Sequence, residues 1–432
     1  METSTGKVNK IEMLSFGGAQ FATGIYMAFL SYYLMMFCTD VALIPPTVTA
    51  VLLFCHRFFS MVDDLALGLF VNRMHFKDGK YRPYFKWCAL PFAISLAALG
   101  MTPGISVNAR VIYLAFTLFF CELCRSALYT ASISMLPYLA QDDVNRTKFV
   151  SFSNGGAILA FIAVGTFMLP IADFFGDDDR NKGFAFALVL FAGIVALLHF
   201  NAYYRLKEWH YVDNVDKFTI KDMLSAIGRN RRIMLFFIGF CIYSMGDAFK
   251  NMTTYYYITY NIGRADLLPV IMLAGLISPL AAQPVIPRLL TYAKKESIIT
   301  LGLFASSCAS LMMLVAGNCP YALIPCVMLY GLFTAVVSNL AFAMIASFSD
   351  EIRSEQNMSM SEILAASLSL SSSTGILVAS GAAPLIMAVF GYEAQAAVQT
   401  TNALLGIKTL YIICTATGMA LSGIILLLFR KE

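Results

Sequence analysis

Long apolar runs separated by short polar segments follow one another along the whole chain. Each run has about 20 or more residues, the length that an α-helix needs to cross the roughly 30 Å hydrocarbon layer of a membrane. The alternating pattern of a transmembrane barrel is not visible. The pattern therefore predicts an all-α membrane protein, because helices satisfy their own backbone hydrogen bonds in lipid.

Twelve such runs can be separated. They lie near residues 13–38, 46–72, 84–102, 108–138, 149–173, 184–204, 232–260, 267–291, 297–316, 320–348, 361–390 and 405–429. The longest hydrophilic stretch falls in the middle, so we expect two six-helix bundles, 1–204 and 232–432, joined by a cytoplasmic linker at 205–231. Within the linker, residues 219–228 have apolar positions at helical spacing, which predicts an amphipathic helix on the membrane surface.

Composition supports this class, since 59% of the residues are hydrophobic and 13% are charged, unlike a soluble domain. The net charge is +4, but the basic residues are scattered over short loops, so the expected environment is the lipid bilayer and no nucleic-acid partner is expected. With twelve spans, 22 of the 30 Lys and Arg residues lie on the side of the termini and five on the other. The positive-inside rule then predicts a multi-pass inner-membrane protein with both termini in the cytoplasm.

Seven charged residues fall away from the ends of the predicted spans, nearer mid-span, where charges are costly and commonly mark function. They are Arg57, Asp63, Asp64, Glu122, Arg125, Asp247 and Lys250. The last four form two pairs of opposite charge, each spaced three residues apart on one helix face. Each pair is either neutralised within its own helix or acts as a midplane switch, in which salt bridges form and break as the bundles rock.

The second span differs, because it holds two aspartates and one arginine. If all groups are ionised, one negative charge is unbalanced, and such a carboxylate takes up a proton or binds a metal cation. Asp63 and Asp64, aided by Ser60, are therefore the candidate site for a coupling cation, H⁺ or Na⁺. In the alternative interpretation, an aspartate near the cytoplasmic end of this helix is simply hydrated.

The second span and the loop after it contain RFFSMVDDLALGLFVN at 57–72 and DGKYRP at 78–83. This sequence resembles the glycoside-pentoside-hexuronide cation symporters, which are melibiose permease-like members of the major facilitator superfamily. The resemblance continues through Thr39-Asp40-Val41 and through YYITYNIG at 256–263. It implies the twelve-helix major facilitator fold and sugar uptake with H⁺, Na⁺ or Li⁺ by alternating access.

The resemblance also suggests roles for individual residues. Asp64 matches the second cation-binding aspartate of the family, Ser60 stands where the first would be, and Asp63 stands where melibiose permease has an asparagine. Arg57 matches a charged family position and is grouped with the substrate-binding residues. Three residues, Asp78, Lys80 and Arg82, match the cytoplasmic latch that holds one closed state in the family.

The sugar-binding positions depart from the family pattern. Gly24 and Tyr129 stand where the family has aspartates, Asn154 replaces an arginine, and Ser373 or Thr374 falls where a lysine is expected. All four charges are therefore replaced by neutral groups. A cavity lined in this way costs less to desolvate and favours a less polar substrate.

Four tyrosines gather at the outer end of the seventh predicted span. They are Tyr255, Tyr256, Tyr257 and Tyr260. Packing and an aromatic belt at the lipid surface are the simpler explanation, and a stacking surface for a ring-containing substrate is the alternative.

These observations favour a cation-coupled uptake carrier for a sugar, a glycoside or a less polar small solute, acting as a monomer. The alternatives are an uncoupled facilitator or exporter of a non-sugar solute and a transporter-like membrane sensor. Neither an enzyme nor a resident metal or other cofactor is expected, because no catalytic motif is visible and the four histidines are dispersed.

Overall fold

The computed structural model describes residues 9–73, 79–140, 143–177, 179–208, 230–282, 285–316, 319–356, 361–396 and 398–430. The described residues fold into helices without a strand. The predicted amphipathic helix at 219–228 lies outside this part of the chain, so it stays a prediction.

The chain forms two compact units. The first consists of Met1–Leu30, Val41–Ile44 and Phe58–Val215, and the second of Ser31–Asp40, Pro45–Arg57 and Asp216–Glu432. Residues 31–40 and 45–57 thus belong to the second unit, although they precede the predicted linker. The predicted division at 205–231 itself is not tested, because most of the linker lies outside the described residues.

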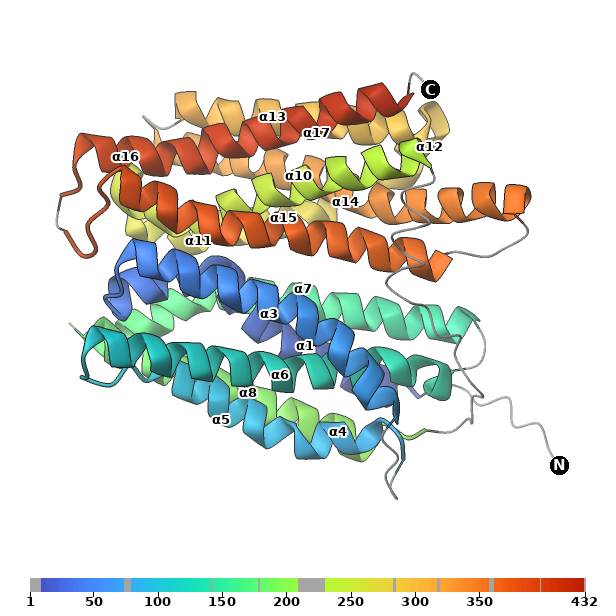
Figure 1. Ribbon diagram of the computed structural model, residues 1–432, viewed down its shortest axis with the longest axis horizontal. Coiled ribbons are helices and arrows are strands. Elements are labelled where there is room, and N and C mark those ends of the chain that lie inside the picture. The colour runs from blue at the N-terminus through green and yellow to red at the C-terminus, as the bar shows by residue number, and fades with distance from the viewer. Residues whose placement is uncertain are drawn as a thin grey trace. The chain divides into compact units, whose positions relative to one another are not determined.

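The helices before the linker are α1 (Lys10–Tyr32), α2 (Leu34–Met36), the π-helical η1 (Phe37–Val41), α3 (Pro46–Arg73), α4 (Arg82–Trp87), α5 (Ala89–Gly100), α6 (Val107–Leu139), α7 (Asp143–Gly176) and α8 (Arg180–Arg205). The helices after it are α10 (Arg231–Tyr256), η2 (Tyr257–Ile262), η3 (Ala265–Leu267), α11 (Leu268–Ala282), α12 (Ile286–Tyr292), α13 (Lys295–Ala316), α14 (Pro320–Gln356), α15 (Ser361–Val389), α16 (Thr401–Lys408), η4 (Thr409–Cys414) and α17 (Thr415–Arg430). Each predicted span overlaps one of these helices or a series of consecutive ones (Figure 1).

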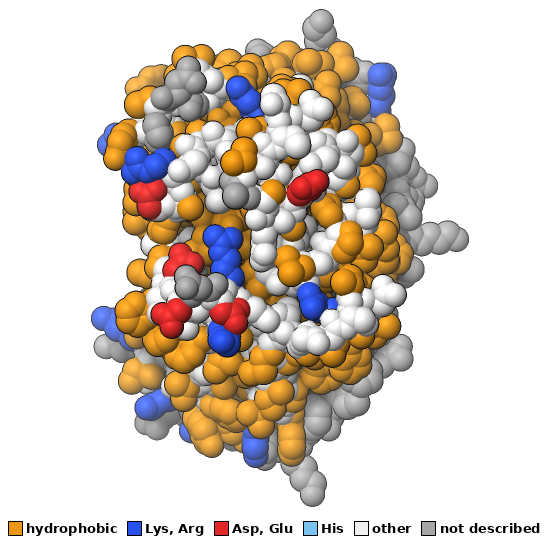
Figure 2. Space-filling model, turned by 90° about the vertical axis from the view of Figure 1, so that its left-hand side faces the viewer, with side chains coloured by type: hydrophobic (Ala, Val, Ile, Leu, Met, Phe, Trp, Pro, Cys, Tyr) orange, Lys and Arg blue, Asp and Glu red, His pale blue; other side chains and the backbone are white. Residues whose placement is uncertain are grey.

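The membrane character of the fold follows from the helices themselves. Ten stretches of described helix are long and apolar enough to cross a membrane. Figure 2 shows hydrophobic side chains mainly over the flanks, whereas other side chains, backbone and several charged side chains gather towards the middle of the view. An apolar outer surface of this kind is stable in contact with lipid chains, which confirms the prediction of a multi-pass membrane protein.

Polar residues begin several of the helices. The carboxylate of Asp179 accepts hydrogen bonds from the backbone N–H groups of Asn181 and Lys182 at the start of α8. These bonds, the one from Lys182 above all, lower the pKa of Asp179. Asn230 caps α10 in the same way, so both helices begin where a residue preferred at this position satisfies their first donors.

Small residues allow the helices of the first unit to pack closely. A Cβ atom added to Gly17 of α1 would lie 2.7 Å from the backbone oxygen of Phe152 in α7, and one added to Gly156 of α7 would overlap the backbone oxygen of Gly17. Close backbone approach at small residues is typical of helix pairs in membranes, where lipid gives no hydrophobic driving force for association. The α1–α7 contact therefore depends on these glycines.

In the second unit, α10 lies between α15 and α17 (Figure 1). The backbones of α10 and α17 approach at Gly246 and Gly418, and Gly375 of α15 packs against the backbone of Cys241 in α10. This close packing holds α10 between two neighbours, so its polar side chains have defined positions.

We predict that Gly156→Ala destabilises the protein, whereas Gly155→Ala does not. The added methyl group of Gly156→Ala overlaps the backbone of α1, and overpacking of this kind costs about 1–3 kcal/mol. A Cβ atom at the adjacent Gly155 meets nothing within 4 Å, so alanine there is neutral or stabilises the helix by up to about 1 kcal/mol. Thermal unfolding of both variants in detergent tests this. Equal midpoints would contradict the assigned packing of α1 on α7.

Candidate functional site

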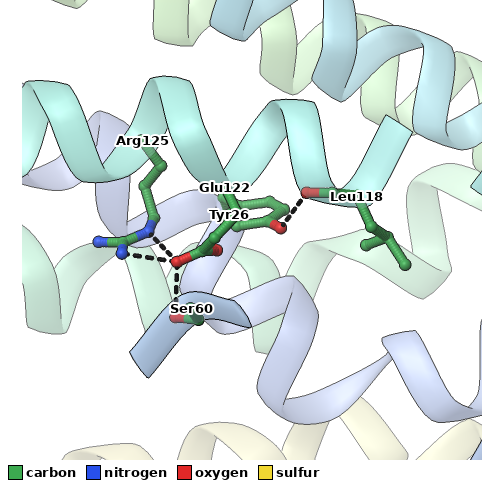
Figure 3. Close-up of polar contacts among 5 residues, drawn as sticks. All are labelled: Tyr26, Ser60, Leu118, Glu122 and Arg125. Atoms are coloured by element: carbon green, nitrogen blue, oxygen red, sulfur yellow. Dashed lines mark hydrogen bonds and ion pairs between the residues drawn. The ribbon is translucent and has the colours of Figure 1, made fainter. Parts of the chain in front are cut away.

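A buried ion pair in α6 is the centre of the polar interior of the first unit. Glu122 Oε1 accepts hydrogen bonds from Arg125 Nε at 3.0 Å and from Arg125 Nη2 at 2.6 Å. Ser60 of α3 donates to the same oxygen at 2.7 Å (Figure 3). Glu122 is fully buried and Arg125 is 3% exposed. The interpretation of this pair as neutralised within one helix is therefore confirmed, and its role as a switch stays a prediction.

The predicted cation-binding residues lie on α3, where Asp63 and Asp64 follow Ser60 by about one turn. Asp63 is 5% exposed and lies within electrostatic range of Cys124 of α6. Asp64 lies on α3, but its side chain is outside the described residues. Ser60 already donates to Glu122, so α3 and α6 are joined at the residue that we expect to aid cation binding.

The predicted sugar-side residues of the first unit have different surroundings. Gly24 packs against α7, since a Cβ atom there would lie 2.8 Å from the Cβ of Ala160. Tyr129 is 41% exposed, and the Arg125 guanidinium lies 5.7 Å from its ring centre. Asn154 is exposed. The geometry thus gives Gly24 a packing contact, and substrate contact by these three residues stays a prediction.

The remaining predicted substrate residues belong to the second unit. Ser373 and Thr374 are half-buried on α15, and Thr374 Oγ1 donates to the backbone oxygen of Leu370 in its own helix. Arg57 of α3 is also half-buried. The structure brings Ser373 and Thr374 onto one turn, next to the Ser372 hydroxyl that joins α15 to Ser244 of α10.

The second predicted pair, Asp247 and Lys250, differs from the first. Asp247 accepts from Tyr330 of α14 at 3.0 Å and from Asn251 at 2.9 Å. Lys250 is 8% exposed, and its ammonium lies over the rings of Tyr330 and Tyr411. Among the described residues, no hydrogen bond or ion pair joins Asp247 to Lys250. The two charges lie within electrostatic range of each other, while tyrosine and asparagine donate the hydrogen bonds to the carboxylate. Neutralisation within the helix and a role as a switch both stay predictions for this pair.

A second polar cluster is formed around Asp40, to which the sequence analysis gave no role. Its Oδ1 accepts from Tyr260 at 2.8 Å and from Tyr392 at 2.7 Å. Gln395 Nε2 donates to its backbone oxygen at 2.7 Å. Asp40 is fully buried, and a buried polar group needs hydrogen-bond partners of this kind. In the sequence, Asp40 could have been singled out because it is a carboxylate at the end of a predicted span.

The tyrosines of α10 and η2 also belong to the interior. Tyr255, Tyr256 and Tyr257 are at most 1% exposed, so they do not form an aromatic belt at the lipid surface. The Tyr256 hydroxyl is 2.7 Å from Thr39, and the Tyr257 ring stacks on Tyr411. The packing interpretation is therefore correct for these three side chains, and the belt interpretation is wrong.

The predicted cytoplasmic latch binds the end of α8. Arg82 donates from Nε to the backbone oxygen of Tyr203 at 2.7 Å. Glu208 accepts from the backbone N–H groups of Lys80, Tyr81 and Arg82 at 2.7–2.8 Å. Asp78 lies outside the described residues. Glu208, absent from the sequence-based candidates, thus supplies a carboxylate to three donors at the start of α4.

We predict that Glu208→Ala destabilises the first unit by about 1 kcal/mol, the usual cost of losing a side-chain cap at a helix start. Glu393, an exposed glutamate, provides a control in Glu393→Ala. The measurement is the thermal midpoint of each purified variant. A loss no larger than that of the control would show that the three backbone donors are equally well satisfied by water.

We also predict that removing Glu122 alone costs more than removing both charges. Glu122→Leu leaves the Arg125 guanidinium buried without its carboxylate, which costs about 3–5 kcal/mol, whereas replacing both members of a buried pair is often nearly neutral. Stability is compared for Glu122→Leu, Arg125→Met and the double variant. A double variant less stable than either single variant would contradict this account of the pair.

Comparison with known proteins places these features in a family. The sequence profile described as "MFS/sugar transport protein" matches residues 15–431. The "Isoprimeverose transporter" of Lactiplantibacillus pentosus is 26% identical over 428 residues, which cover 98% of this chain and 88% of that protein. The "Uncharacterized symporter YnaJ" of Bacillus subtilis (strain 168) is 24% identical and covers 93% of this chain and 87% of its own.

A solved structure has the same fold. The crystal structure of the nucleoside transporter NupG superimposes with a TM-score of 0.71 at 13% identity, covering 98% of this chain and all of that one. This similarity confirms the predicted major facilitator fold. Because the profile covers nearly the whole chain, the protein belongs to the MFS/sugar transport protein family and is a membrane transport protein rather than an enzyme.

Proposed function

We propose that the protein is a cation-coupled symporter that imports a sugar, a glycoside or a less polar small solute by alternating access. One observation supports coupling to a cation. Asp63, on α3 in the first predicted bundle, is only 5% exposed. Such a group is stable in a low dielectric when it is protonated or when a cation lies beside it.

The charges around Asp63 support this proposal. Glu122 and Arg125 neutralise each other within α6. In the sequence, the second predicted span holds two aspartates, Asp63 and Asp64, and one arginine, Arg57. Uptake of one H⁺ or Na⁺ at Asp63 and Asp64 restores neutrality, and the hydroxyl of Ser60 offers a further oxygen. Cation binding can then be transmitted to α6 through the Ser60–Glu122 bond.

The substrate class is supported by the relatives. One is named as a transporter of isoprimeverose and another as a symporter. We propose the inner membrane as the location, with both termini in the cytoplasm, on the basis of the Lys and Arg asymmetry. The carrier acts as a monomer, with a small solute, a coupling cation and lipid as its partners.

We predict that Asp63→Asn/Asp64→Asn abolishes gradient-driven accumulation, because the amides neither take up a proton at neutral pH nor attract Na⁺. The measurement is uptake of radiolabelled glycosides, isoprimeverose among them, into proteoliposomes with an imposed H⁺ or Na⁺ gradient. The wild type should concentrate its substrate about tenfold for a gradient worth 1.4 kcal/mol, and the double variant should only equilibrate it. Asp266→Asn, at an exposed aspartate, is the control.

The same assay separates the alternatives. Uptake by the wild type that is indifferent to both gradients would identify an uncoupled facilitator or exporter. Binding without any flux would favour a sensor. Accumulation that survives in the double variant would place the cation site elsewhere.

A further inference from the structure

One turn of α10 in the second unit carries three polar side chains that the coupling proposal does not use. They are Asp247, Lys250 and Asn251. Asp247 and Asn251 are half-buried, and the rings of Tyr330 in α14 and Tyr411 in η4 lie beside them. A carboxylate, an amide and an ammonium are thus combined with aromatic surfaces within one unit.

Lys250 is the member of this group that lacks a polar partner. Although it is only 8% exposed, no acceptor in the described part of the chain takes a hydrogen bond from its Nζ. The ammonium lies 4.8 Å from the ring centre of Tyr330 and 5.9 Å from that of Tyr411. Aromatic faces attract a cation but accept none of its three N–H groups conventionally. A buried ammonium in this state favours any ligand that brings acceptor oxygens.

The carboxylate of Asp247 is oriented by its partners but can accept further hydrogen bonds. Asp247 accepts one hydrogen bond on each oxygen, from Tyr330 and from Asn251. An ionised carboxylate has about four acceptor sites, so a hydroxyl donor of a ligand can still bind to it. Tyr330 and Asn251 therefore position the acceptor, and Lys250 supplies the donor a turn away.

The balance of charge limits the class of ligand. One carboxylate and one ammonium within electrostatic range of each other leave the group neutral overall. A neutral ligand preserves this balance, whereas an acidic one would add a second negative charge near Asp247 in a low dielectric. Hydroxyl groups both donate to a carboxylate and accept from an ammonium, and ring C–H faces pack on tyrosine.

We propose that Asp247, Lys250 and Asn251 form a binding subsite for the hydroxyl groups of a neutral sugar ring, with Lys250 Nζ donating to a ligand oxygen. This inference rests on the proposed transport of a sugar or glycoside and gives it a site.

The test measures binding without any ion gradient, by isothermal titration calorimetry on the full chain in detergent. The probes are isoprimeverose, methyl β-xyloside, methyl β-glucoside and the glucuronide that corresponds to the last. We expect Lys250→Met to weaken binding of the best neutral probe about tenfold or more, a change of about 1.4 kcal/mol. Lys408→Met, at a half-buried lysine near the start of η4, should change it less than about twofold. The glucuronide should bind more weakly than the glucoside.

Further variants keep the test decisive if Lys250→Met does not fold. Asp247→Asn and Asn251→Ala should each weaken the same probe, and Lys250→Arg should retain part of the affinity. Unchanged binding in the folded variants, failure of every neutral probe to bind the wild type, or preference for the glucuronide would each overturn the proposal. Because coupling is measured separately through Asp63 and Asp64, a failure of symport leaves these affinities unaffected, and the two proposals fail independently.

Discussion

A charge inside a membrane helix must be matched by donors or by an opposite charge, and the described interior satisfies this requirement in three places. Glu122 binds Arg125 and Ser60, Asp40 receives two tyrosine hydroxyls, and Asp247 receives a tyrosine and an asparagine. Each match also joins separate elements of the chain, because at least one donor comes from another element: Ser60 for Glu122, Tyr260 and Tyr392 for Asp40, and Tyr330 for Asp247. The polar contacts therefore set which helices are held together, while glycine contacts set how closely they approach.

The three matches differ in how readily they could change during transport. The Glu122 cluster joins α3 to α6 through the hydroxyl of Ser60, the bond through which the proposed cation site on α3 would act on α6. Asp40 accepts hydrogen bonds from residues that lie hundreds of positions later in the chain. These bonds fix the segment that follows the first predicted span. Asp247 lies within electrostatic range of the Lys250 ammonium, which donates no hydrogen bond to any described residue.

The helices themselves were predictable from the sequence. Apolar runs of about 20 residues specify membrane spans whatever their neighbours are. The runs do not reveal local interruptions of the helices: α4 and α5 divide at Cys88, and the first span ends in the π-helical η1. The ion pair of Glu122 and Arg125 was equally predictable from the sequence, because a spacing of three residues along a helix brings two side chains together. The same spacing brings Asp247 and Lys250 within electrostatic range, but the hydrogen bond from Tyr330 of a distant helix to Asp247 could not be predicted from it.

The sequence by itself thus determined the class of protein, the spans, the unusual charges and the resemblance to sugar symporters, because each depends on composition or on spacing within one helix. Tertiary structure decided the partners of these charges. Tyr392 lies 352 positions after Asp40, and Glu208 lies more than 120 positions after the donors it binds at the start of α4. Such pairings depend on which helix faces meet after packing, and no periodicity along the chain encodes that choice.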